Sequence, residues 1–260
     1  MSIIKVDSRI EEYRHRARAN DINELSGRTH RSDLTLFVNS EIKKHMELIE
    51  GDVLVDIGCG DGTLLYLAEK QRVSCIGILP TDEEVKRVRD RFSNSQAKVR
   101  IEKGLAPKTN LPSNIASKVV CNGVFPILNY DEVGLALKEI VRISMQGALV
   151  YIGELPFNNE NEGKDYGDSI LKWLLWVFKT QGFGQFTIRL KQTLKAIFSK
   201  EPLIIVPKEH YYSTPEDFIK KAKSVGLIIK ETFRHKSISL NKEIIESNSR
   251  QDYLFTVEKG

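Results

Sequence analysis

The chain has 260 residues, of which 41% are hydrophobic and 28% charged, and this composition is typical of one large globular domain. Its net charge of +4 is too small to indicate nucleic-acid binding by itself. Three scattered cysteines, Cys59, Cys75 and Cys121, lack metal-ligand spacing and are typical of a reducing compartment. No apolar run reaches the roughly 18 residues of a membrane helix. The N-terminus lacks the apolar core of a signal peptide, so we expect a cytoplasmic protein.

Two helices are expected before the first strand. The first begins near Ser8, which is the expected N-cap with Glu11 three residues later. Its arginines are most simply explained as a solvated face. The second runs from residue 32 or 33 to 49, and a turn-rich stretch, 20–31, lies between the two.

The next segment, 53–63, has the pattern of a buried strand, a glycine turn and a helix start. A short apolar, β-branched run precedes the turn, as in the central strand of a parallel sheet. Asp56 and Asp61 place carboxylates at the turn, which suits a cationic ligand group better than a phosphate. Three glycines permit tight backbone geometry and the close approach of a ligand: Gly58, Gly60 and Gly62.

The run from Asp56 to Thr63 resembles the cofactor-binding motif of class I S-adenosylmethionine-dependent methyltransferases. Its spacing, G-x-G-x-G, differs from the G-x-G-x-x-G of dinucleotide-binding folds. The alternative is a glycine-rich turn in an unrelated α/β protein. The resemblance implies a Rossmann-like α/β fold, with a seven-stranded, mostly parallel sheet whose last strand is antiparallel and with helices on both faces. It also implies S-adenosyl-L-methionine as cofactor, with Asp56 near the methionine amino group and the turn around Cys59 beside it.

The resemblance places two adenosine contacts after the next two strands, 73–78 and 99–101. Relatives carry an acid at the position of Leu79 that binds the ribose hydroxyls, and leucine cannot accept those hydrogen bonds. Pro80 follows, and Thr81 or Asp82 is expected either to substitute or to leave adenosine less tightly bound. Thr81 is also the expected N-cap of the following helix.

The second adenosine contact is expected at Leu105 and Ala106. Many relatives have an acid at Leu105 that binds the adenine amino group, whereas a leucine offers the adenine only an apolar wall. Asn122 and Gly123 lie at the carboxyl end of the fourth strand, 119–122. They are expected to border the sulfonium, because ligands of open α/β sheets lie at the carboxyl ends of the strands.

The fifth strand, 148–152, follows a helix over 131–144 that is expected to end with Gly147 as its C-cap. Its exit carries Glu154, on the face where the acceptor is expected. The resemblance covers about residues 50–156 well and 210–260 more loosely.

Residues 157–209 are expected to form a helical insertion. The segment 170–178 is densely apolar and holds both tryptophans of the chain, and a second amphipathic helix is expected over 187–198. Between Ser169 and Lys200 there are six basic residues and no acidic one. This pattern fits an acceptor lid or homodimer contact that buries the tryptophans, a basic surface touching membrane lipids, or a nucleic-acid contact.

The last helix is expected to begin with Thr214 as N-cap and Pro215 at the first helical position. Two strands, 227–233 and 252–257, close the sheet. The polar stretch between them, 235–250, is expected to be a link on the active face.

Methyl transfer to a hydroxyl of high pKa needs a group that accepts the proton, most often a histidine. His210 is the first candidate because it precedes the last helix, which begins on the face where the strands end. His30 is the second candidate, carried in by the N-terminal segment, and His235 is the third. Glu154 is expected to act as base or to hydrogen-bond the acceptor. Each of these residues also has a simpler interpretation as a solvated side chain, and no pattern indicates a metal.

We therefore expect one methyltransferase domain over 1–260, with 1–49 as a helical lid and 157–209 as the insertion. The expected activity is methyl transfer to a hydroxyl of a small molecule or glycan. One alternative is a non-catalytic or regulatory protein of this fold, which the two leucines at the adenosine positions favour. The other is a nucleic-acid methyltransferase, which the weak net charge does not favour.

Overall fold

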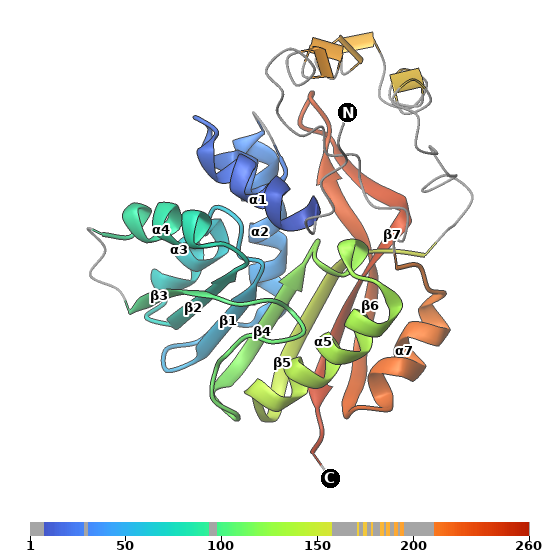
Figure 1. Cartoon of the computed structure of the whole chain (residues 1–260). Coiled ribbons are helices and arrows are strands. Elements are labelled where there is room, and N and C mark those ends of the chain that lie inside the picture. Colours follow the sequence, from blue (N-terminus) through green and yellow to red (C-terminus); the bar gives the residue numbers. More distant parts are fainter. Residues whose placement is uncertain are drawn as a thin grey trace.

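The structure of the chain is a computed structural model. It describes residues 8–28, 31–93, 98–157 and 211–259, together with separate positions between 171 and 194. Seven strands form one sheet in the order β3-β2-β1-β4-β5-β7-β6 (Figure 1). β7 runs antiparallel to both of its neighbours, and the other strands are parallel to one another. The expected fold class is confirmed. The strands are β1 (Val53–Ile57), β2 (Ser74–Leu79), β3 (Val99–Lys103), β4 (Ala116–Asn122), β5 (Ser144–Pro156), β6 (Leu227–Ile238) and β7 (Ile244–Val257).

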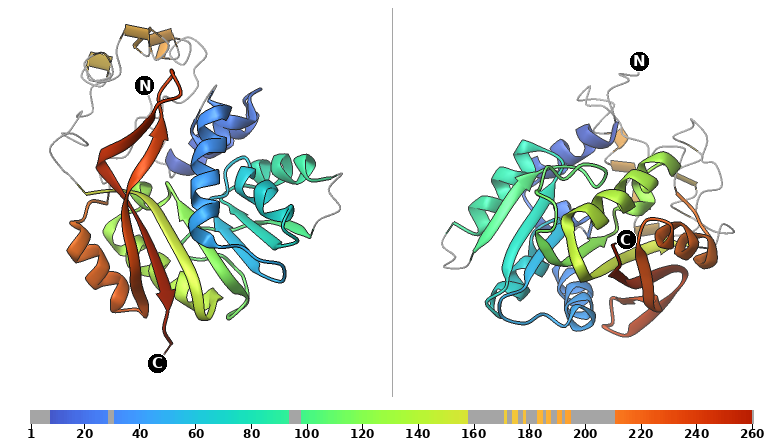
Figure 2. Two further views of the ribbon diagram at one scale, coloured as in Figure 1. Left: turned by 180° about the vertical axis from the view of Figure 1, so that it is seen from behind. Right: turned by 90° about the horizontal axis from the view of Figure 1, so that it is seen from below.

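Helices cover both faces of the sheet (Figure 2). Successive strand residues point to opposite faces. Val55 therefore joins a core with α5 and α7, and Leu54 joins a second core with α2, α3 and α4. The helical elements are α1 (Ser8–Arg18), η1 (Ile22–Ser26), α2 (Ser32–Met46), α3 (Thr63–Glu69), α4 (Asp82–Arg91), η2 (Phe125–Ile127), α5 (Tyr130–Ile143) and α7 (Pro215–Lys223).

Side-chain caps fix the helix starts that face the carboxyl ends of the strands. Thr81 accepts a hydrogen bond from the backbone N–H of Glu84 at 3.3 Å, and Thr214 accepts one from Asp217 at 3.2 Å. Both caps were predicted and both are confirmed. α5 begins with a capping box between Asn129 and Glu132.

Gly147 is not the C-cap of α5, contrary to the prediction. The helix ends at Ile143, and the hydroxyl of Ser144 donates a hydrogen bond to the carbonyl of Ile140 at 2.7 Å. This bond satisfies a carbonyl at the end of the helix, and the chain passes directly into β5. Gly147 lies within the first residues of that strand with φ +75°.

The stretch 235–250 is not a link, because most of it belongs to strands. β6 and β7 pair as far as Ile238 and Ile244, so the two strands form a long hairpin. β6 runs parallel to β5, and the hairpin continues past the carboxyl ends of the central strands (Figure 1). This extension places its side chains beside the candidate site.

The expected insertion lies partly outside the described residues, which exclude 158–170 and 195–210. The described positions between 171 and 194 are helical. Among the described residues, no helix combines the length and the apolar character that a membrane crossing requires.

Candidate functional site

The glycine turn after β1 is packed tightly against two other segments. Gly58 donates its backbone N–H to the carbonyl of Ile78 in β2 at 2.9 Å. A Cβ on Gly58 would lie 2.4 Å from Cγ2 of Val124, which follows β4. A Cβ on Gly60 would lie 3.1 Å from Cα of Ser26, the last residue of η1. The turn therefore holds the carboxyl ends of β1, β2 and β4 together beneath the N-terminal segment.

Asp56 is a buried carboxylate at this turn, and no described residue donates a hydrogen bond to its side chain. It lies in β1 and is 5% exposed. Burial, together with the nearby charge of Asp61, raises the pKa of the Asp56 carboxyl to about 7. A buried carboxylate without a partner is costly, so a cationic ligand group here would be bound strongly.

Asp61 has partners within the chain. Its carboxylate accepts hydrogen bonds from the backbone N–H and hydroxyl of Thr63, at 3.2 and 2.6 Å, and from Arg91 at 2.9 Å. It therefore stabilises the start of α3. Of the two carboxylates predicted at the turn, Asp56 is the one left for a ligand. Gly62 has φ +79° and Cys59 is buried, and burial raises the pKa of the Cys59 thiol well above its usual range.

The end of β2 offers no free carboxylate to a ribose. Leu79 is buried, and Pro80 is partly buried. The hydroxyl of Thr81 donates a hydrogen bond to Glu84 at 2.8 Å while it caps α4. Asp82 is exposed and forms an ion pair with Lys103 at 2.6 Å.

Leu105 and Ala106 differ in exposure. Leu105 follows β3 and is 49% exposed, whereas Ala106 is buried in the core. The neighbouring Gly104 is packed against the backbone of Thr109, where a Cβ would lie 2.7 Å from its carbonyl oxygen. Leu105 is thus held outward at the end of the strand that the resemblance assigns to adenine.

The ends of β4 and β5 meet at Asn122 and Glu154. Nδ2 of Asn122 donates a hydrogen bond to the Glu154 carboxylate at 2.9 Å, and Oδ1 of Asn122 is buried with no partner among the described residues. Gly123, with φ +69°, lies against the same pair, since a Cβ on it would lie 3.7 Å from Cδ of Glu154. Glu154 itself has φ +60°, which is uncommon for a residue with a side chain and typical of functional sites.

Glu154 is surrounded by cations. Arg28 and Arg250 bind its two carboxylate oxygens, the latter at 3.0 Å, and Nε2 of His235 lies 3.9 Å away. Burial works to raise the pKa of Glu154, but these cations outweigh it and lower that pKa to about 2. Glu154 is therefore charged at neutral pH and is a weak base, although it remains a good hydrogen-bond acceptor.

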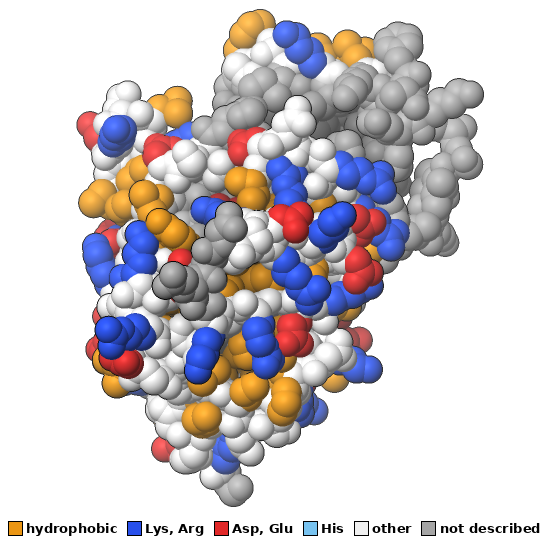
Figure 3. Space-filling model, turned by 90° about the vertical axis from the view of Figure 1, so that its left-hand side faces the viewer, with side chains coloured by type: hydrophobic (Ala, Val, Ile, Leu, Met, Phe, Trp, Pro, Cys, Tyr) orange, Lys and Arg blue, Asp and Glu red, His pale blue; other side chains and the backbone are white. Residues whose placement is uncertain are grey.

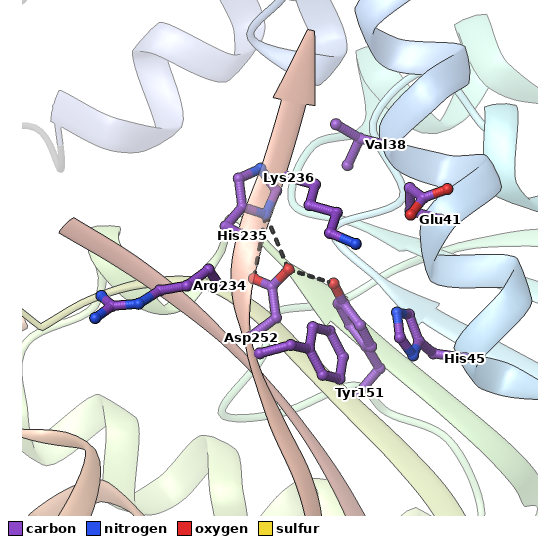
Figure 4. A pocket seen from close by; sticks show the side chains of 9 residues that line it. Val38, Glu41, His45, Tyr151, Arg234, His235, Lys236 and Asp252 are labelled. Atoms are coloured by element: carbon purple, nitrogen blue, oxygen red, sulfur yellow. Dashed lines mark hydrogen bonds and ion pairs between the residues drawn. The ribbon is translucent and has the colours of Figure 1, made fainter. Parts of the chain in front are cut away.

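A second buried carboxylate, Asp252, contacts His235 and Tyr151 (Figure 4) and also binds the backbone of Glu154. It accepts hydrogen bonds from the backbone N–H of Glu154 at 2.7 Å and from the hydroxyl of Tyr151 at 2.7 Å. Nδ1 of His235 lies 3.0 Å from the same carboxylate. Burial works to lower the pKa of His235, but the Asp252 hydrogen bond and the Glu154 charge outweigh it and raise that pKa. The hydrogen bond from the backbone N–H of Glu154 to Asp252 explains how Glu154 keeps its positive φ angle.

Sequence reasoning ranked His235 third and gave Asp252 and Tyr151 no role. The sequence did offer one signal for Asp252, which is an acid at the start of the otherwise largely apolar strand 252–257. His30 and His210, the other two histidine candidates, lie outside the described residues. No group of metal-binding side chains occurs among the residues that the structure describes.

The N-terminal segment is fastened across the carboxyl ends of the strands at three places. Arg9 in α1 binds the Glu132 carboxylate at 2.8 Å and the carbonyl of Ile127 at 3.1 Å. Arg87 in α4 donates to the carbonyl of Ala17 at 2.9 Å. The third contact is the ion pair of Arg28 with Glu154. The segment thus spans from α4 to α5 above the glycine turn (Figure 1).

Comparison with known proteins agrees with this geometry. Residues 55–152 match the sequence model of a methyltransferase domain. No sequence among curated proteins matches the chain.

Three solved structures are similar in fold. One is a chain of the complex between the Trm112 methyltransferase activator of Haloferax volcanii and its candidate methyltransferase; it is 14% identical, with 96% of this chain and 97% of that chain covered and a TM-score of 0.63. Another is a SAM-dependent methyltransferase from Aquifex aeolicus, 15% identical, with 92% and 100% covered and a TM-score of 0.56. A third, from Methanosarcina mazei, is 14% identical, with 84% and 96% covered and a TM-score of 0.56. The chain has the fold of class I S-adenosylmethionine-dependent methyltransferases, and the matched domain implies S-adenosylmethionine as the cofactor.

Proposed function

We propose that the protein transfers a methyl group from S-adenosylmethionine to a hydroxyl of a small molecule or glycan. The observation that carries the proposal is the buried Asp56 carboxylate, which has no partner among the described residues and lies at the end of β1. The cofactor's methionine carries an ammonium group, which is the kind of partner this carboxylate lacks. When bound, the cofactor supplies a methyl group already activated by its sulfonium.

On the adenosine side, the residues favour apolar contact over hydrogen bonding. Leu105 is exposed at the position where we expect the adenine ring to bind. Asp82, the acid nearest the end of β2, forms an ion pair with Lys103 and is not free to bind the ribose. We therefore expect the affinity for S-adenosylmethionine to depend mainly on Asp56, on the glycine turn and on the N-terminal segment that lies over this turn, called here the N-terminal cover. In this proposal the part of the N-terminal segment that precedes α2, residues 8–28, is a lid that excludes water from the reacting groups, whereas α2 packs into the core.

On the acceptor side, Glu154 and Asn122 are the candidate binding groups. The Glu154 carboxylate stays charged at neutral pH and accepts hydrogen bonds, and Oδ1 of Asn122 is a second acceptor without a partner among the described residues. Two oxygen atoms that accept hydrogen bonds thus lie at the ends of β4 and β5. They suit a methyl-accepting substrate with hydroxyl groups, because a hydroxyl donates a hydrogen bond.

Proton removal falls to a histidine in this proposal, because a carboxylate with a pKa of about 2 is a poor base for a hydroxyl. His210 and His30 remain candidates from the sequence. His235 lies 3.9 Å from the Glu154 carboxylate and is oriented by Asp252. We assign His235 a positioning role, since its ring lies between the carboxylates of Asp252 and Glu154, and the pocket that it lines with Tyr151 and Asp252 is small (Figure 4).

Two alternatives remain in the proposal. A non-catalytic protein of this fold is favoured by the missing ribose carboxylate. A nucleic-acid methyltransferase has less support, because the face with α4 and β3 shows Lys and Arg side chains spread out among acidic ones rather than gathered in one patch (Figure 3).

Calorimetric titration with S-adenosylmethionine and S-adenosylhomocysteine tests the cofactor half of the proposal. We expect micromolar binding that Asp56→Asn weakens at least tenfold, while Asp82→Asn, which changes an exposed acid, leaves it unchanged. No binding by the parent protein would favour the non-catalytic alternative.

Transfer of labelled methyl groups to panels of hydroxylated, amino and nucleic-acid acceptors tests the other half. Label confined to hydroxylated acceptors is expected. Label on amines or nucleic acid alone would overturn the hydroxyl assignment.

A further inference from the structure

Exposed apolar side chains gather at one end of the molecule. In the described part of the insertion, Leu171 is 68% exposed and Phe183 is 69% exposed, and Leu175, Phe178 and Leu194 are also exposed. Leu171, Leu175 and Phe178 follow one another at intervals of four and three residues. They therefore lie on one side of a helix.

Three phenylalanines of this segment form an aromatic cluster. The ring centroid of Phe178 lies 5.5 Å from that of Phe186 and 6.4 Å from that of Phe183. Phe183 and Phe186 are 6.3 Å apart. Phe178 is 46% exposed and Phe183 is 69% exposed. Aromatic rings exposed as a group are rare on monomers without a binding role.

The tip of the β6–β7 hairpin adds apolar surface at the same end of the molecule (Figure 1). Leu240 is 82% exposed, and Ile244 and Ile245 are exposed beside it. Ile244 and Ile245 pair with Ile238 and Ser237 in the hairpin, and Leu240 lies in the turn that the Ser239–Glu243 backbone bond closes.

The charge is one-sided in the central part of the insertion, 169–200, whereas the flanking parts of 157–209 hold six Asp or Glu residues. The sequence from Ser169 to Lys200 contains six Lys or Arg residues and no Asp or Glu. Among the described positions, Lys191 is exposed. Exposed apolar and aromatic residues combined with unopposed positive charge are the signature of a segment that lies in the interface of an anionic membrane.

We propose that this apolar end, made of the described insertion residues and the hairpin tip, binds reversibly to the surface of an anionic lipid bilayer. A second copy of the chain is the less favoured occupant, because a self-complementary contact would bring two uniformly basic segments together. The proposal does not depend on the methyltransferase reaction. Were both correct, the catalytic face would be held near acceptors carried at the membrane, since the hairpin extends from that face.

Both tryptophans of the chain lie within the insertion, so the unlabelled protein carries its own probe. Full-length protein is titrated with vesicles of phosphatidylglycerol and phosphatidylcholine, and with phosphatidylcholine alone. We expect a blue shift of the tryptophan emission and quenching by brominated lipid with the anionic vesicles. Binding should fall at least tenfold between 50 and 500 mM salt, because salt screens the lipid charge.

Phe183→Asp and Leu240→Asp are expected each to weaken vesicle binding at least tenfold. The matched control is Leu135→Asp, which replaces a 54% exposed leucine on α5, away from this end. Far-ultraviolet circular dichroism verifies that all three variants fold. Equal loss in the control, equal binding to neutral vesicles, or no binding at all would overturn the proposal. A dimer that light scattering detects without lipid, and that Phe183→Asp dissociates, would assign the surface to a second copy instead.

Discussion

Arg28 forms an ion pair with Glu154, and this contact joins the residues after η1 to the end of β5, 126 positions further along the chain. Both side chains are largely shielded from solvent, with exposed fractions of 16% and 13%. Removing one partner of such a pair leaves a charge in a poorly hydrated place, which costs more than the loss of a surface pair. The position of the N-terminal cover and the charge state of Glu154 therefore depend on each other.

Arg28→Ala is expected to loosen the cover. Ser26 lies directly against the glycine turn, so a detached segment would no longer shield the cofactor. We expect the dissociation constant for S-adenosylmethionine to rise about tenfold, equivalent to about 1.4 kcal/mol. Calorimetry measures this change, and hydrogen exchange of the described backbone amides 20–28 should become faster.

Arg100→Ala provides the matched control for this prediction. Arg100 pairs with Glu102 on β3, where its side chain is 56% exposed, and surface pairs contribute little to stability. Its removal should leave both cofactor affinity and hydrogen exchange unchanged. If the two variants bind the cofactor equally well, the Arg28 contact does not hold the cover.

The second prediction concerns the pH dependence of cofactor binding. The pKa of Asp56 is about 7 in the folded chain, against an ordinary value near 3.8, so the unliganded protein holds a proton that the unfolded chain releases. Stability from this group is therefore greatest below about pH 4 and falls as pH rises toward 7. A bound ammonium group favours the carboxylate. Affinity for S-adenosylmethionine should therefore rise between about pH 6 and 8, with release of a proton on binding.

Titration calorimetry in buffers of different ionisation enthalpy measures that proton directly. Near pH 6 the parent protein should release a substantial fraction of one proton per cofactor bound. In Asp56→Asn the release should vanish. The free energy of unfolding of that variant at pH 8 should equal or exceed that of the parent, because a partnerless buried charge has been removed. Proton release that persists in the variant would assign it to another group.

Local patterns in the sequence were enough to predict the features fixed within a few residues. Thr81 and Thr214 cap their helices as expected, since a hydroxyl and an N–H three residues later suffice. The turn from Asp56 was likewise visible, because its strand and glycines are contiguous. Gly147 misled the prediction because Ser144, three residues earlier, already satisfies the helix carbonyl.

Contacts between distant residues could not be predicted in the same way. The extended hairpin was missed because neighbouring strand residues such as Ile244 and Ile245 are both exposed, so no alternation of buried and polar positions marks a strand there. The contact between Tyr151 and Asp252 joins residues 101 positions apart. Nothing in either local sequence distinguishes such a pair from ordinary strand residues.

The third prediction tests the packing of the glycine turn. Gly60→Ala introduces a Cβ 3.1 Å from the Ser26 backbone at φ +54°. Gly147→Ala is the matched control, since φ is +75° and nothing lies within 4 Å of the added atom. Both should lose about 1–2 kcal/mol of unfolding free energy from the left-handed backbone conformation. Only Gly60→Ala should also weaken cofactor binding, by several-fold. Equal cofactor affinities in the two variants would mean that the segment around Ser26 can move away from the turn without any effect on binding.

The last prediction uses the His235–Asp252 pair. The folded-state pKa of His235 is raised, so its contribution to stability is fully present below about pH 6.5, the ordinary value, and is lost as pH rises through the raised pKa. His235→Gln should lower the melting temperature at pH 6 and flatten its dependence on pH in the alkaline direction. Above about pH 7 Asp56 no longer changes the stability with pH, so Asp56→Asn should leave the alkaline loss intact. Thermal unfolding of both variants and the double variant between pH 5 and 9 separates the two groups. An alkaline loss that survives in His235→Gln would show that the histidine is not charged between its two carboxylates.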